Sequence, residues 1–164
     1  MQENNNAKVK VSAPARLHLG FLDLHGGLGR MFGSLGVSLN DISTDIETRH
    51  GSRLDISGPG KESAHKYAIR MLTHLNIRSG LKMDIQAAIP EHAGLGSGTQ
   101  MALAVGMSIS KLFDANLSLK TIARILDRSN RSGIGIGAFA GGGFIVDAGR
   151  SSATEVPPIL SQLH

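Results

Sequence analysis

The sequence predicts one α+β domain, in which a sheet carries its helices on one face. The length of 164 residues suits a single compact domain, and no linker or internal repeat divides residues 1–164. Segments that alternate apolar and polar residues are interrupted by segments of helical periodicity, in the order several strands, helix, strand, two helices, strand. Because strands and helices do not alternate regularly, a doubly wound parallel sheet is excluded, and a Rossmann domain with it.

The first third of the chain is predicted to be β structure. Residues 9–13 alternate up to Pro14, and residues 17–19 alternate again, which predicts a strand followed by a bend. Turn residues such as Asn40 and Asp41 separate the apolar positions that follow. Further short strands are therefore expected over residues 37–39, 42–48 and 54–56.

The rest of the chain mixes helices and strands. Residues 61–76 place their apolar side chains on one helical stripe, whereas residues 81–87 alternate as a strand that stops before Pro90. A helix over residues 99–113 is apolar on nearly every side and is therefore expected to be buried. An amphipathic helix over residues 119–129 and a last strand over residues 144–146 complete the order.

Composition excludes several classes of protein. The apolar runs are broken by glycine or polar residues long before they could span a bilayer. Cysteine is absent, which excludes disulfides, thiolate metal sites and a cysteine nucleophile. Residues 1–10 lack the apolar core of a signal peptide, so a cytoplasmic location is expected.

Charge and aromatic content bear on the ligand. The formal net charge is +4, a modest excess that suits an anionic small molecule at least as well as nucleic acid. Aromatic residues make up only 4% of the chain and tryptophan is absent, which disfavours a reader of single-stranded nucleic acid, since such readers stack bases on aromatic rings. The 21 glycines concentrate in residues 20–36, 94–98 and 133–143, which we interpret as candidate walls of a binding site.

Residues 90–99, PEHAGLGSGT, join the end of a predicted strand to the start of the buried helix. A helix N-terminus presents unpaired amides, and glycines let a polyphosphate approach the backbone, so the segment predicts anion binding. The alternative is a tight turn in which Ser97 or Thr99 caps the helix. A Walker loop is excluded, because no Gly-Lys-Ser/Thr sequence follows.

The PxxxGLGSG pattern followed by a buried helix resembles the second motif of the GHMP kinase superfamily, usually PxxxGLGSSA. The resemblance implies the N-terminal α+β domain of those proteins, a fold also seen in a ribosomal protein domain. It also implies that the motif residues bind substrate phosphates: Gly94, Leu95, Gly96, Ser97, Gly98 and Thr99. Two positions depart from the kinases. Gly98 replaces the second serine, and Gly135 stands where the SGxD motif of the kinases has its catalytic aspartate.

Four strings together resemble one branch of the superfamily, the β-ribofuranosylaminobenzene 5′-phosphate synthases of methanopterin biosynthesis. They are APARLHLGFLDL, GLGSGTQMALAV, RSGIGIGAF and GGFIVDAG, in this order. The resemblance implies condensation of phosphoribosyl pyrophosphate with 4-aminobenzoate or 4-hydroxybenzoate, with release of pyrophosphate and carbon dioxide. It also implies a second, C-terminal domain that this chain is expected to lack, so that a homodimer or a separate partner chain would complete the site.

This chemistry suggests roles for individual residues. Mg²⁺ is the expected cofactor, with the hydroxyls of Ser97 and Thr99 as candidate ligands. Arg30 or Arg131, each beside glycines, is expected to bind the 5′-phosphate or the benzoate carboxylate. Ser132, next to Arg131, is also expected to bind substrate. Asp23 and Arg30 are the candidate catalytic residues, and Asp23 is expected to bind the metal or to stabilise positive charge on the sugar. His18 is expected to contact substrate.

Each of these residues also has a structural interpretation. Arg16, Asp23 and Arg30 are equally well explained as an ion-pair set, and His18 as a structural residue of a strand. Asp147 is interpreted as a turn residue. Arg124 and Arg128 are four residues apart, which favours one solvated helix face over phosphate binding.

Two other functions stay open from the sequence. The first is an ATP- and Mg²⁺-dependent GHMP small-molecule kinase, which would need a base at a position other than 135. The second is a non-catalytic module that binds phosphate or RNA, against which the low aromatic content counts.

Overall fold

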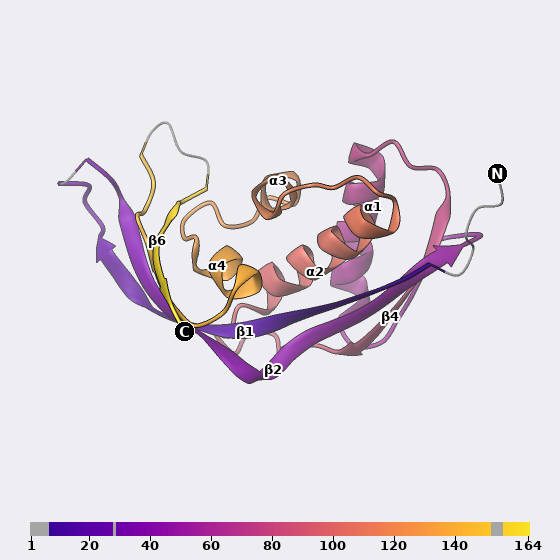
Figure 1. The fold of residues 1–164 in the computed structure, drawn as a ribbon, viewed down its shortest axis with the longest axis horizontal. Helices are drawn as coiled ribbons and strands as arrows, with labels where there is room; N and C mark the ends of the chain where they lie inside the picture. The colour runs from indigo at the N-terminus through magenta and orange to yellow at the C-terminus, as the bar shows by residue number, and fades with distance from the viewer. Residues whose placement is uncertain (1–6, 28, 152–155) are drawn as a thin grey trace.

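The computed structural model describes residues 7–27, 29–151 and 156–164, so the first six residues of the polar N-terminal segment lie outside the described part. The described strands form one mixed sheet in the order β3-β4-β2-β5-β6, with β1 paired to β2. Four helices lie on the same face of this bent sheet (Figure 1). The prediction of an α+β domain with helices on one face is confirmed.

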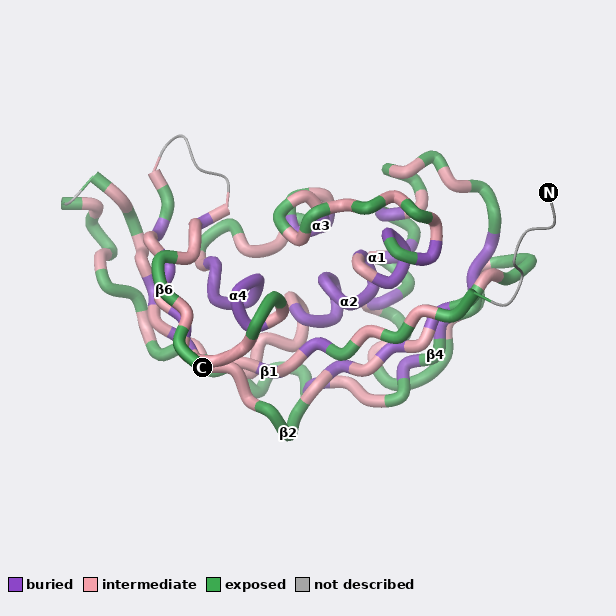
Figure 2. Tube along the Cα trace, viewed as in Figure 1, coloured by how far each residue is buried: buried purple, intermediate pink, exposed green. Residues whose placement is uncertain are grey.

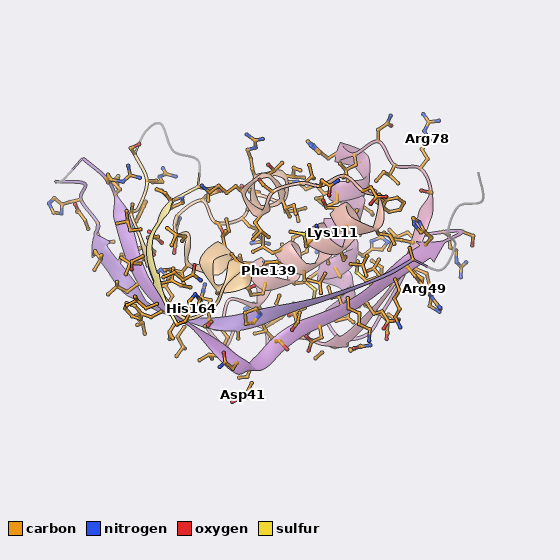
Figure 3. The ribbon with its side chains drawn as sticks, in the orientation of Figure 1. Asp41, Arg49, Arg78, Lys111, Phe139 and His164 are labelled. Atoms are coloured by element: carbon orange, nitrogen blue, oxygen red, sulfur yellow. The ribbon has the colours of Figure 1, made fainter. Side chains whose placement is uncertain are left out.

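The two longest strands of the described sheet pair with each other in antiparallel fashion: β1 (Lys8–Asp23) and β2 (Phe32–Gly51). The sequence predicted separate short strands here, which is wrong for β2. Its partner β1 continues across the bend, with Pro14 paired to Ser43 and Ala15 paired to Leu39, so that the intervening residues of β2 form a bulge. Asp41 lies at this bend, where the expected turn bends β2 without ending it (Figure 3).

The two halves of β2 have different neighbours. Its C-terminal half pairs with β4 (Gly80–Ala87), which pairs in parallel with β3 (Asp55–Ser57). Its N-terminal half pairs with β5 (Phe144–Asp147), and β6 (Ile159–Leu163) adds an edge strand that the sequence did not predict. The bend of β2 therefore joins two half-sheets.

Two of the predicted helices are confirmed almost to the residue, α1 (Lys61–His74) and α2 (Ser97–Leu112). The third, α3 (Leu119–Ile125), starts at the Ser118 cap but ends well before residue 129. The fourth, α4 (Ile134–Ala140), occupies the third glycine tract, where we expected a wall and no helix. No helix of the described residues is long and apolar enough to cross a membrane.

Helix α2 runs through the centre of the core (Figure 2). Its side chains are buried on almost every face, as its all-round apolar sequence predicted. Gly106 lets α3 pack closely, since a Cβ atom there would lie 2.2 Å from Cγ2 of Ile122. A helix held on all sides keeps its N-terminus in a fixed place, and that N-terminus is part of the candidate site.

Candidate functional site

The glycine motif forms the loop that leads into α2. Gly96 is the N-cap residue in a left-handed conformation, φ 81°, and no side chain caps the helix. The alternative in which Ser97 or Thr99 caps a simple turn is therefore wrong, because both residues lie inside the first turn. The first amides of an α-helix have no intrahelical partner, so this end of α2 presents N–H donors and the positive end of the helix dipole.

A cavity of about 380 Å³ lies beside the start of α2. Residues of β1, of the first turn of α2, of the segment between α3 and α4, and of the first turn of α4 line this cavity. The structure thus brings together four residues that the sequence nominated from three separate motifs: His18, Thr99, and the neighbours Arg131 and Ser132. Of the other motif residues, 94–96 form the adjoining loop, and Ser97 and Gly98 are the first two residues of α2.

Arg16 lines the cavity, although the sequence suggested for it only a structural ion pair. Its Nη1 donates to the carbonyl of Gly94 at 2.9 Å, and its amide donates to the carbonyl of Leu95 at 3.0 Å. A Cβ atom at Gly96 would lie 3.1 Å from Cζ of Arg16, so the guanidinium packs directly against the loop. The signal was available, because Arg16 and His18 are two residues apart on one strand and therefore share a face.

Burial and charge shift the titration of both β1 residues. Desolvation lowers the pKa of the Arg16 guanidinium. Desolvation also lowers the pKa of His18, and the positive charge of Arg16 lowers it further, while the negative charge of Asp147 opposes both effects. The surroundings of these two residues therefore disfavour a second positive charge on the β1 wall of the cavity.

The segment between α3 and α4 contributes two more arginines, Arg128 and Arg131. The interpretation of Arg128 as part of a solvated helix face with Arg124 is wrong, because α3 ends at Ile125 and Arg128 lines the cavity. Among the described lining residues the one carboxylate is Asp127, which accepts a hydrogen bond of 2.7 Å from Asn130. Three arginines against one carboxylate make the cavity electropositive.

Asp23 is the last residue of β1 and Arg30 lies in the connection to β2, and neither is among the residues that line the cavity. Asp23 accepts hydrogen bonds from the amides of His25 and Gly26 and pairs with the His25 side chain at 2.9 Å. Arg30 donates to the carbonyls of Ala148 and Gly149 at 2.7 and 2.9 Å. Among the described contacts these residues form no ion-pair set with Arg16, and a part in catalysis stays a prediction for both.

Asp147 is more than the turn residue we expected. Its Oδ1 accepts a turn hydrogen bond of 2.8 Å from the amide of Gly149, but its Oδ2 also accepts from Ser132 Oγ at 2.9 Å and from the amide of Gly133 at 2.8 Å. Ser34 of β2 donates to the same carboxylate through both its amide and its hydroxyl. Asp147 therefore fixes the cavity wall that Ser132 belongs to.

Gly135 lies on the cavity wall in the first turn of α4. A Cβ atom at this position would lie 2.8 Å from Cγ2 of Thr99. The position that carries an aspartate in the resembled kinase motif is thus packed against the first turn of α2 and has no acid or base group.

The residues present fit Mg²⁺ only as the partner of a bound polyphosphate. Among the described residues, no group of three or more histidines or carboxylates could hold a metal ion. The hydroxyls of Ser97 and Thr99 are neutral oxygens, and Asp127 is the one carboxylate of the described lining. Mg²⁺ keeps several waters and takes phosphate oxygens readily, so an ion here would be held mainly by the ligand.

Fold and cavity together define a class: the chain has the fold of a GHMP kinase N-terminal domain. The family model described as GHMP kinases N terminal domain matches residues 63–143, which run from α1 through the glycine loop to the end of α4. Mevalonate kinase of L. major, solved in complex with R-mevalonate, superposes with a TM-score of 0.67 at 18% identity, covering 97% of this chain and 54% of the other. A likeness at this identity concerns the fold alone.

Sequence similarity points to one branch of the class. The β-ribofuranosylphenol 5′-phosphate synthase of Methanocaldococcus jannaschii is 36% identical over 155 residues, which cover 86% of this chain and 47% of the relative. The protein of the same name from Archaeoglobus fulgidus is 33% identical over 146 residues, which cover 88% and 46%. The resemblance to this branch is confirmed, and the chain spans about half the length of the curated relatives it matches.

Proposed function

We propose that this chain is the diphosphate-binding half of a phosphoribosyl-transferring, decarboxylating synthase of methanopterin biosynthesis. The substrates would be phosphoribosyl pyrophosphate and an aromatic acid, 4-hydroxybenzoate or 4-aminobenzoate. The relatives are named for a phenol product, and 4-hydroxybenzoate leaves a phenol when its carboxyl group departs. Their names therefore favour 4-hydroxybenzoate.

One observation carries the proposal: the start of α2 and three arginines meet at one cavity. When the bond between the anomeric carbon and the diphosphate breaks, negative charge develops on the leaving group. Fixed amide donors and guanidinium groups stabilise such charge without having to reorganise. In this proposal Arg16, Arg128 and Arg131, which line the cavity, take this role.

The reaction also agrees with the glycine at position 135. Loss of carbon dioxide from an aryl carboxylate leaves an electron pair on the ring carbon, and that pair forms the new bond to the anomeric carbon as the diphosphate leaves. This step removes no proton from the ring, so it needs no base. Phosphorylation of a hydroxyl does release a proton, and a kinase would need an acceptor near it.

The alternative functions have weaker support. The fold is shared with GHMP kinases, but the kinase base position is Gly135, which is closely packed against Thr99. A non-catalytic phosphate or RNA module would use the same electropositive cavity, but the 4% aromatic content offers little for base stacking.

The proposal includes a cofactor and a partner surface. Mg²⁺ would arrive with the diphosphate, supply charge neutralisation to the leaving group and be contacted by Ser97 and Thr99. We propose that a second domain of the same protein, a separate chain or a second copy supplies the wall that binds the aromatic acid, in a cytoplasmic enzyme.

The test is a calorimetric titration of the chain with phosphoribosyl pyrophosphate and with ATP, each in the presence of Mg²⁺. We expect tighter binding of phosphoribosyl pyrophosphate, and a loss of about tenfold or more in Arg16→Gln, since a charge-assisted hydrogen bond contributes about 1.5–3 kcal/mol. Preferential binding of ATP, together with transfer of its terminal phosphate to an alcohol, would establish the kinase instead.

A further inference from the structure

The segment of residues 127–131 carries buried polar atoms that have no partner. Arg128 Nε and Ser129 Oγ are both buried without a hydrogen bond, and so is His18 Nε2 across the same cavity. Asp127 and Ser129 also adopt left-handed backbone conformations, φ 56° and 63°. A buried donor without an acceptor is unfavourable, so this wall of the cavity holds more buried polar atoms than the protein around it satisfies.

Tyr67 of α1 holds Arg128 in place. Arg128 Nη2 donates a hydrogen bond to the Tyr67 hydroxyl, and Cζ of Arg128 lies 5.3 Å from the centroid of the tyrosine ring. A hydrogen bond and a cation–π contact together restrict the guanidinium more than either does alone. Tyr67 is half-buried and lies far from every glycine motif in the sequence.

The held guanidinium lies over the start of α2. A Cβ atom at Gly98 would lie 4.0 Å from Cζ, Nη1 and Nη2 of Arg128. Gly98 is the position at which this sequence departs from the GLGSS pattern, and a Cβ atom there would be in ordinary van der Waals contact with the guanidinium. The start of α2, through Thr99, and residues 128–129 therefore line the same cavity.

We propose that Arg128 and Ser129 bind the second phosphoryl group of a diphosphate whose first phosphoryl group lies on the amides at the start of α2, and that Tyr67 is the positioning residue for Arg128. The ligand class is a diphosphate or a diphosphate ester. This inference rests on the proposed function, because it takes the α2 start as the first subsite. It assigns the second subsite to a segment that no motif marks.

The experiment compares sodium pyrophosphate with inorganic phosphate in calorimetric titrations of the same chain. A single phosphate ion occupies one subsite at a time, whereas a single pyrophosphate ion spans both. We expect the wild type to bind pyrophosphate at least about tenfold more tightly than phosphate, and Arg128→Gln to lose most of that preference while its phosphate affinity changes less than about twofold. Ser129→Ala should lose pyrophosphate affinity by about three- to fivefold. Lys120→Gln removes an exposed positive charge from α3 and is the matched control.

Tyr67 variants test the positioning role. Tyr67→Phe keeps the ring and removes the hydroxyl, so we expect about a threefold loss of pyrophosphate affinity and unchanged phosphate affinity. Tyr67→Leu removes both contacts and should approach the loss of Arg128→Gln. In the double variant Tyr67→Leu/Arg128→Gln the losses should not add, because Tyr67 acts through Arg128. A merely structural role would give additive losses and would weaken both anions alike.

Two contrary results have separate meanings. If the wild type binds neither anion, the proposed function fails and this inference fails with it. If the wild type binds both, but Arg128→Gln weakens both equally or neither, only the second subsite is overturned. Tyr67→Phe is the mildest change, so its selective effect can be read even if Tyr67→Leu disturbs folding.

Discussion

The carboxylate of Asp147 accepts a hydrogen bond of 2.9 Å from the hydroxyl of Ser132, fifteen residues earlier in the chain, while only 1% of Asp147 is exposed. The same carboxylate also accepts from Ser34 on β2 and from the amide of Gly133, the N-cap residue of α4. The buried Asp147 side chain thus connects β5 to β2 and to the start of α4. This connection holds the cavity wall formed by residues 131–135 against the sheet.

We therefore expect Asp147→Ala to lower the free energy of unfolding by about 3–5 kcal/mol, because it leaves several buried donors without an acceptor. Urea denaturation monitored by circular dichroism measures the change. Asp41→Ala, at the exposed bend of β2, is the matched control and should stay within about 0.5 kcal/mol of the wild type (Figure 3). A loss below about 1 kcal/mol in Asp147→Ala would show that the donors find other partners.

The sequence predicted the parts of this site that depend on local rules. The glycine loop and the buried helix after it follow from backbone freedom and apolar periodicity, and α2 begins within two residues of the prediction. The presence of His18, Thr99, Arg131 and Ser132 on one cavity agrees with the motifs that nominated them.

The missed features depend on contacts between distant segments. Asp147 followed by Ala148-Gly149 has the pattern of a turn, and nothing local shows that Ser34 lies against it. Helix α4 is stabilised by burial that overrides its glycines, with residues such as Ile134 fully enclosed. The spacing of Arg124 and Arg128 predicts one helix face, but the helix ends three residues before Arg128.

Gly96→Val should abolish diphosphate binding. Gly96 has φ 81°, which a β-branched residue adopts only with strain, and its side chain would meet the Arg16 guanidinium at about the 3.1 Å found for a Cβ atom. Calorimetry with pyrophosphate measures the loss, which we expect to be at least about tenfold. Gly29→Val is the control: Gly29 also has a left-handed φ, 80°, but it lies in the hairpin, and a Cβ atom there has no neighbour within 4 Å. Retained binding in Gly96→Val would remove the loop from the site.

His18 should make the fold less stable in mild acid. Desolvation, followed by the charge of Arg16, holds the pKa of His18 in the folded chain below its ordinary value of 6.5. The unfolded chain then binds more protons, so this contribution to stability is complete above about pH 6.5 and is lost as the pH falls below it. Urea midpoints measured from about pH 7.5 to about pH 5 should fall more steeply in the wild type than in His18→Asn. Parallel curves would show that His18 titrates normally in the folded chain.

The contact between Gly135 and Thr99 can be measured with a double-mutant cycle. Alanine is favoured over glycine inside a helix by about 1 kcal/mol, but a Cβ atom at position 135 would lie 2.8 Å from Cγ2 of Thr99, and overpacking costs about 1–3 kcal/mol. We expect Gly135→Ala to lower the free energy of unfolding by about 1 kcal/mol in the wild type and to raise it by about 1 kcal/mol in Thr99→Ser, which lacks Cγ2.

The same cycle bears on why a kinase base does not fit here. An aspartate at position 135 would place its Cβ atom too close to the methyl group of Thr99, whatever the direction of its carboxylate. Gly135→Asp should therefore destabilise the wild type more than it destabilises Thr99→Ser, and should weaken pyrophosphate binding in both by adding negative charge beside the arginines. Equal destabilisation in the two backgrounds would mean that α4 can move away from Thr99 to accommodate a side chain. Packing against Thr99 would then not explain the glycine at position 135.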